Sequence, residues 1–149
     1  MSANGCKITL KKQNDKICFG NIVPQGMPFY GGNLTYKTEI FVPQDCDMKV
    51  IIPQYKGALT KVFLDGEDKG RIVIAPYELD IENVSKGKHI IEFILFGNRY
   101  NTFGPLHYCG AVWWCSSGRY YSEGNEMCYE YNTKATGILK SPVIKLYKN

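Results

Sequence analysis

The stretch that decides the fold is residues 60–107, TKVFLDGEDKGRIVIAPYELDIENVSKGKHIIEFILFGNRYNTFGPLH, because short apolar runs alternate there with turn residues. Two of these runs, 62–64 and 71–74, are joined across Asp65-Gly66, which is typical of a β-hairpin with a tight turn. The chain then breaks at Pro76-Tyr77. We therefore expect two antiparallel strands in the first half of this stretch.

Two more strands are predicted in the second half. Residues 78–81 alternate polar and apolar side chains, as a half-buried strand does. Residues 89–96 are almost wholly apolar apart from Glu92. That run is too short for a typical helix and is rich in Ile and Phe, so a central strand of a sandwich fits it best.

The remainder of the chain also favours strands over helices. No window of about 10 to 12 residues keeps a 3.6-residue apolar period, and the 15 glycines, 11 tyrosines and 7 phenylalanines suit turns and aromatic-rich strands. Other predicted strands are 6–10, 17–19, 34–42, 49–52, 109–115, 127–131, 135–139 and 143–147. With 149 residues, of which 44% are apolar, the chain has the length of one domain with one core. The prediction is an all-β fold, a two-sheet antiparallel sandwich.

The charge and the cysteines narrow the function. The net charge is +4 with scattered lysines, and nucleic-acid binding would need a basic stripe with interleaved aromatics. The first residues lack a signal-peptide pattern and no run approaches membrane-spanning length, so we expect a soluble chain without a membrane partner, with a cytoplasmic location favoured. The six cysteines include no Cys-x-x-Cys pair, which favours reduced thiols over a zinc site, with disulfides as the alternative for an exported parent protein.

Several motifs resemble a known family. Residues 62–71 read VxLDGxxxGR, 76–81 read PYxxDI and 86–93 read KGxHxIxF, and the Gly97–His107 loop and the GxPFYxG run at 26–32 extend the series. This order resembles the galactose-binding-like jelly-roll domains attached, often C-terminally, to bacterial glycoside hydrolases of the α-L-rhamnosidase and β-galactosidase kind. The resemblance covers roughly residue 25 to the C-terminus.

The resemblance implies both an organisation and a role. Residues 1–24 are expected to be leader strands or a linker from a larger parent, and residues 25–149 the galactose-binding-like sandwich. The implied function is a non-catalytic module that binds carbohydrate of the galactose, rhamnose or arabinose type and accompanies the catalytic domain of a parent glycoside hydrolase. The alternative is a purely structural module that buttresses the catalytic domain or a subunit interface and binds no sugar.

The acidic residues do not predict an enzyme. Glycoside hydrolysis needs two facing carboxylates, and nucleophilic catalysis needs a nucleophile beside a base. Asp65, Glu67 and Asp68 crowd a turn, where acids are ordinary solvated residues, and His107 with Cys109 lacks a third orienting group. We expect no catalytic residues, which leaves a stand-alone enzyme as the weakest alternative.

No cofactor or metal is expected, with one structural possibility. The acids of residues 65–68, with Asp45 and Asp47, offer the hard oxygen ligands that calcium prefers. A structural calcium occurs in many galactose-binding-like folds, but calcium needs six to eight oxygens in a cage, which a sequence cannot show to converge.

A sugar site needs an aromatic platform and a few hydrogen-bonding groups. The predicted carbohydrate-binding residues are Tyr30, Arg99, Asn101, His107, Trp113 and Trp114, with Tyr120 and Tyr121 as further platforms. Since neighbours on a strand point to opposite faces, Trp113 and Trp114 cannot both be buried by their own sheet. The alternative is a structural loop in which Arg99 pairs with a carboxylate and the aromatics pack the sandwich or a neighbouring domain.

Overall fold

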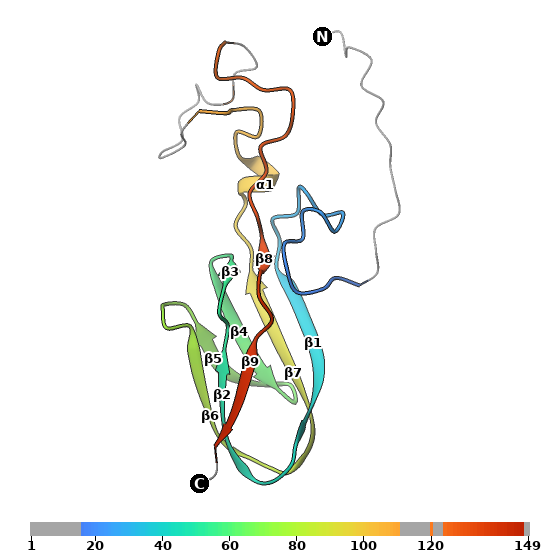
Figure 1. Cartoon of the computed structure of the whole chain (residues 1–149), viewed down its shortest axis with the longest axis vertical. Helices are drawn as coiled ribbons and strands as arrows, with labels where there is room; N and C mark the ends of the chain where they lie inside the picture. Colours follow the sequence, from blue (N-terminus) through green and yellow to red (C-terminus); the bar gives the residue numbers. More distant parts are fainter. Residues whose placement is uncertain (1–15, 111–119, 121–123, 148–149) are drawn as a thin grey trace.

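The chain is an all-β sandwich of two antiparallel sheets (Figure 1). The computed structural model describes residues 16–110, 120 and 124–147, and the statements that follow concern these residues. The larger sheet has the order β1 (Leu34–Val42), β7 (Gly87–Phe96), β4 (Leu59–Leu64), β5 (Glu67–Ile72). The smaller sheet has the order β6 (Glu78–Val84), β2 (Cys46–Ile51), β9 (Val143–Tyr147). A short ladder joins β3 (Tyr55–Lys56) to β8 (Gly137–Ile138), and α1 (Tyr100–Phe103) is a single helical turn. These elements confirm the predicted sandwich.

The core lies between the sheets because alternate side chains of each strand point inward. In β7 every second residue from His89 to Leu95 is buried, and in β2 every second residue from Cys46 to Val50 is buried. Phe93 is 1% exposed and is the largest of the fully buried side chains. β7 pairs with both β1 and β4, which confirms the central strand predicted for residues 89–96.

The turns agree with the local sequence. Asp65 and Gly66 adopt positive φ angles of 52° and 84°, as a two-residue hairpin turn requires, and they join β4 to β5. β1 spans the predicted 34–42, and β9 the predicted 143–147. Residues 78–81 lie in β6, and 49–52 overlap β2, which begins earlier, at Cys46.

Other strand predictions were wrong. Residues 17–19 form no strand, residues 127–131 contribute only the isolated bridge between Met127 and Tyr108, and 135–139 shrink to the two residues of β8. Of these runs, Ile17 and Phe19 still pack against the core without belonging to a strand. The predicted strand 6–10 and most of 109–115 lie outside the described residues.

The segment before residue 24 packs against the sandwich. Ile22 is fully buried, and the Phe19 ring stacks on Tyr36 with 5.1 Å between ring centroids. Gly20 N–H donates to the Ile138 carbonyl at 2.7 Å, and Ile22 N–H donates to the Thr136 carbonyl at 3.0 Å. The described part of residues 1–24 therefore contributes to the core, and the division at residue 24 stays a prediction.

The two rims of the sandwich carry different structures. β1 begins where β7 ends, and this rim holds the 24–33 loop, α1 and the described loop residues that follow α1 (Figure 1). The β4–β5 turn, the β6–β7 turn and the β1–β2 loop gather at the opposite rim. None of the helices in the described part of the chain is long and apolar enough to cross a membrane.

Candidate binding site: a hollow beside Arg99

Two loops meet backbone to backbone at the rim where β7 ends. A Cβ at Gly97 would lie 2.8 Å from the Gly31 carbonyl oxygen and would collide with that of Gly32. A Cβ at Gly31 would lie 2.9 Å from the Asn98 carbonyl oxygen. The Thr102 hydroxyl also donates to the Phe29 carbonyl at 2.8 Å. Because only glycine permits this approach, loop 29–32 and crossover 97–103 hold each other in place.

A hollow of about 260 Å³ opens between these loops. Its lining consists of Phe29, Tyr30, Gly31, Gly32, Arg99, Thr102 and Phe103. The rings are accessible, since Phe103 is 65% exposed, Phe29 43% and Tyr30 38%. The Tyr30 hydroxyl donates to the Asn33 carbonyl at 2.7 Å, which fixes the ring direction. The Arg99 hollow, as we call this site, combines aromatic surface with one guanidinium.

Aromatic contacts extend from the Arg99 hollow to His107. The Phe29 ring meets Tyr131 edge-on at 4.7 Å between centroids, and Tyr131 meets the His107 ring at the same distance. His107 Nδ1 lies 3.0 Å from the Cys128 carbonyl oxygen, so Nδ1 carries a proton and donates it. Nε2 of His107 has no partner among the described residues.

Asn101 is buried and is not part of the lining of the hollow. Its side chain is 1% exposed, and its Nδ2 donates to the Lys134 carbonyl at 2.7 Å. Its Oδ1 accepts from Lys134 N–H at 2.8 Å. Lys134 in turn places Nζ 3.9 Å from the centroid of the Tyr100 ring. Asn101 thus ties the crossover to the chain that leads into β8.

The structure brings some of the predicted residues together. Tyr30 and Arg99 share the hollow, and His107 is connected to it through Tyr131 and Phe29. Tyr120 reaches the same crossover, because its hydroxyl donates to the Phe103 carbonyl at 3.0 Å. Trp113, Trp114 and Tyr121 lie outside the described residues.

Phe29, Thr102, Phe103 and Tyr131 were missed from the sequence. The signal available for Phe29 and Phe103 was a large apolar residue within a turn-rich loop, where no strand would bury it. Nothing local predicts the position of Tyr131, because its contact with Phe29 spans about a hundred residues of chain.

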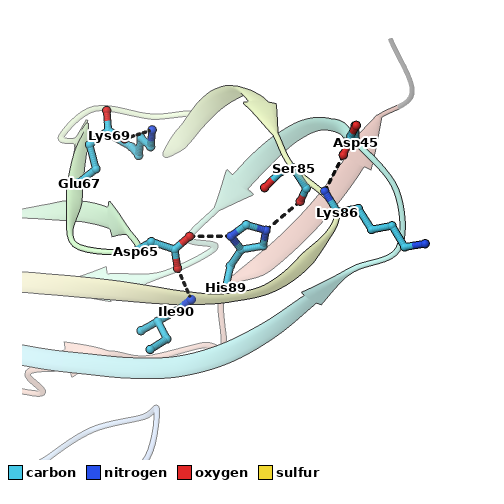
Figure 2. Close-up of polar contacts among 8 residues, drawn as sticks. All are labelled: Asp45, Asp65, Glu67, Lys69, Ser85, Lys86, His89 and Ile90. Carbon is cyan, nitrogen blue, oxygen red and sulfur yellow. Dashed lines mark hydrogen bonds and ion pairs between the residues drawn. The ribbon is translucent and has the colours of Figure 1, made fainter.

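The predicted acids lie at the opposite rim, where they hold the backbone (Figure 2). Asp45 Oδ1 accepts from Lys86 N–H at 2.6 Å, and Asp68 Oδ1 accepts from Gly70 N–H at 3.0 Å. Asp65 Oδ1 accepts from Ile90 N–H at 2.8 Å, while its Oδ2 lies 2.6 Å from His89 Nδ1. Asp65 is an exposed turn residue, as predicted, and its carboxylate in addition joins the β4–β5 turn to β7.

The calcium possibility finds no ligand set among the described residues. In that part of the chain no three metal-ligating side chains of His, Cys, Asp or Glu gather at one point. The carboxylates that the sequence offered are bonded to backbone N–H groups, to His89 or to lysines such as Lys61. The acids do not fit a calcium cage.

Solved structures share the fold. A rhamnosidase from Novosphingobium sp. PP1Y is similar over 78% of this chain with a TM-score of 0.55 and 21% identity. A GH2 β-galacturonidase from Eisenbergiella tayi, bound to galacturonate, is similar over 93% of this chain with a TM-score of 0.53 and 17% identity. A GH2 β-galacturonidase from Eisenbergiella tayi bound to glycerol is similar over 93% of this chain with a TM-score of 0.53 and 18% identity. No family model matches the sequence, and neither does any curated protein.

The matched region covers most of this chain but only a small share of each similar enzyme chain. This chain spans 11% of the rhamnosidase chain and 22% of the galacturonidase chain. The similar region is thus a small part of each enzyme, while it includes most of the chain described here. The chain therefore shares its β-rich fold with a small part of the rhamnosidase and of the galacturonidase.

Proposed function

We propose that the chain is a non-catalytic accessory module of a bacterial glycoside hydrolase and that it binds carbohydrate in the Arg99 hollow. The observation that carries the proposal is that Tyr30 and Arg99, separated by almost seventy residues, line one accessible hollow with Phe29 and Phe103. The similarity to small parts of a rhamnosidase and a galacturonidase supports the role of an attached module.

The chemistry of the lining suits a sugar ring. The apolar C–H face of a pyranose packs on an aromatic surface, and its hydroxyls need donors and acceptors at the edge. Phe103 and Tyr30 supply the surface, and Arg99 and the Thr102 hydroxyl supply polar groups. Asn101 supports the site through its bonds to Lys134. Trp113 and Trp114 belong to the proposal as additional platforms on the strength of the sequence.

Affinity should be modest. The Arg99 hollow is open and holds about one ring, so we expect a monosaccharide to bind with a Kd of order 1 mM, which corresponds to about 4 kcal/mol. Calorimetry or chemical-shift titration with galactose, rhamnose, arabinose and galacturonic acid measures this. Arg99→Ala and Tyr30→Ala should remove binding, and Trp113→Ala and Trp114→Ala should weaken it, while each variant keeps the thermal unfolding temperature of the parent chain.

Matched controls separate the site from general effects. Arg71→Ala removes an exposed arginine from β5, and Tyr147→Ala removes a half-exposed tyrosine from β9. Both should leave binding unchanged. If none of the sugars, nor a broader panel of plant and mucin glycans, perturbs the folded chain, carbohydrate binding is wrong.

A structural module is the second candidate, and the exposed aromatics favour it. Phe103, Tyr131 and Tyr129 are 65%, 58% and 86% exposed, and exposed apolar surface of this kind marks an interface. On this reading the rim docks against the catalytic domain of the parent hydrolase. Phe103→Ser and Tyr131→Ser would then weaken association of the chain with that catalytic domain, measured with the two parts supplied separately, and no sugar would bind.

A further inference from the structure

We infer that the Arg99 hollow recognises a sugar that carries a carboxylate, a uronic acid, in preference to the neutral sugar of the same stereochemistry. The inference rests on the proposed function, since it concerns the class of carbohydrate that the same site takes. It follows from the charge in the hollow, from the chemistry of the guanidinium and from the way the aromatic walls are arranged around it.

The described lining of the hollow is positively charged. Arg99 is its one ionised side chain, and neither Asp nor Glu is among its seven residues. Arg99 is exposed and makes no ion pair with any described residue. Lysines on the sandwich behave differently, as Lys61 pairs with Asp68 at 3.1 Å and Lys49 with Glu78 at 3.3 Å. The guanidinium is thus available to an anion from outside.

No acid in the described lining of the hollow offsets the charge of Arg99. Glu126 is engaged away from the hollow lining, since its carboxylate accepts from the Tyr108 hydroxyl at 2.6 Å. Lys134 lies on the Tyr100 ring, next in sequence to Arg99, and adds a second positive charge to the crossover. The positive charge of Arg99 therefore remains available to an anionic ligand, because the described lining contains no acid that would neutralise it.

A guanidinium discriminates between a carboxylate and a hydroxyl. Its planar N–H fork matches the two oxygens of a carboxylate, and charge-assisted hydrogen bonds of this type are roughly twice as strong as neutral ones. A hydroxymethyl group at the same carbon offers one oxygen and no charge. Phe103 and Tyr30 line the same hollow as Arg99, and apolar surface around an ion pair weakens its screening relative to an open surface.

The shape of a uronic acid fits this arrangement. In a pyranose uronic acid the carboxylate projects from the edge of the ring, so the C–H face can rest on an aromatic wall while the carboxylate meets a cation at the rim. The hollow offers both, because Phe29 and Tyr30 come from one loop and Arg99 and Phe103 from the other. The close backbone contact between Gly31 and Gly97 keeps the two loops in register.

The test compares three probes on the full chain. These are the methyl glycoside of galacturonic acid, the same glycoside as its methyl ester, and the methyl glycoside of galactose, titrated by chemical shift or calorimetry at low salt. We expect the free acid to bind about tenfold more tightly than the other two, a difference of about 1.4 kcal/mol. Raising the salt concentration to about 0.5 M should reduce this preference, since the Debye length falls well below 10 Å.

Variants locate the preference. Arg99→Gln keeps a polar side chain without the charge and should bind all three probes equally, whereas Arg71→Ala should keep the tenfold preference. Thermal unfolding shows whether each variant is folded. Should the acid and the galactoside bind the parent chain equally well, with binding still lost in Tyr30→Ala, the uronic acid inference is overturned and the proposed function stands.

Two other outcomes are also decisive. A preference for the acid that persists unchanged in folded Arg99→Gln would overturn the assignment of the preference to Arg99. Absence of binding by all three probes and by neutral plant and mucin glycans would overturn both the inference and the proposed function.

Discussion

His89 Nδ1 lies 2.6 Å from an Asp65 carboxylate oxygen, across the junction between the β4–β5 turn and β7 (Figure 2). The other ring nitrogen of His89, Nε2, lies 2.8 Å from the Ser85 carbonyl oxygen. Both partners are acceptors, so the ring satisfies both only when each nitrogen carries a proton. The hydrogen bond that His89 donates to Asp65, followed by the one it donates to the Ser85 carbonyl, raises the pKa of His89 above its usual value. The side chain is buried at the rim and is predominantly an imidazolium over a wider pH range than an exposed histidine.

This pair predicts a pH dependence of stability. Because the folded pKa of His89 is raised, its contribution is fully present below the unfolded value of about 6.5 and is lost as pH rises through the folded pKa. We expect the difference in unfolding free energy between the parent chain and His89→Gln to be largest near about pH 5.5 and to shrink toward about pH 9. Urea unfolding across that range measures it. Equal differences at all pH values would contradict the imidazolium assignment.

The pH dependence of stability at acidic pH depends on Asp65. The hydrogen bond from His89, and then that from Ile90 N–H, lower the pKa of Asp65, so its contribution is present above the unfolded pKa and is lost as pH falls through the folded one. The difference in unfolding free energy between the parent chain and Asp65→Asn should therefore become smaller below about pH 4. Glu82→Gln, which changes an exposed acid on β6, is the control. A difference in unfolding free energy that stays constant down to about pH 2 would rule out this contribution of the Asp65 carboxylate.

Asn101 should matter for stability rather than for ligand contact. Asn101→Ala removes the buried side chain that bonds both the N–H and the carbonyl of Lys134, and leaving such partly buried groups unsatisfied costs about 1–3 kcal/mol. We expect a loss of about 2–3 kcal/mol in the free energy of unfolding, measured by denaturant titration. Asn125→Ala, at an exposed position, should change stability by less than about 0.5 kcal/mol. Equal effects of the two substitutions would contradict the role given to Asn101.

Gly97 should be needed for both stability and the Arg99 hollow. Gly97→Ala forces a methyl group against the carbonyl oxygens of loop 29–32, and overpacking of this kind costs about 1–3 kcal/mol. Gly66→Ala tests the backbone alone, since φ is 84° there and nothing lies within 4 Å of the new Cβ. Both variants should unfold at lower temperature, but only Gly97→Ala should also weaken sugar binding. Unaltered binding in folded Gly97→Ala would show that the two loops do not need this contact.

Ile22 tests whether the residues before 24 belong to the folded sandwich. Its side chain is fully buried, and removal of a buried isoleucine side chain to alanine costs about 2–5 kcal/mol. Ile74→Ala is the control, because Ile74 is 79% exposed and should lose less than about 0.5 kcal/mol. If Ile22→Ala were as mild as the control, a boundary near residue 24 would gain support over a core that begins earlier.

The sequence by itself determined the elements whose information is local. The alternation in residues 34–42, the apolar run 89–96 and the Asp65-Gly66 turn each restrict the backbone within a few residues, and β1, β7 and the β4–β5 hairpin form where these signals lie. The motif order in 62–107 was also sufficient to indicate the sandwich fold that the solved structures share.

Only the tertiary structure decided which distant residues share a surface. Tyr30 and Arg99 line one hollow because Gly31 and Gly97 allow two loops to touch. Asn101 is not part of that surface, because its side chain is buried in hydrogen bonds with the Lys134 backbone. Neither contact has a local signature, since each joins segments more than thirty residues apart. Periodicity and turn chemistry act along the chain, whereas a binding surface depends on packing between segments that the sequence pattern does not relate.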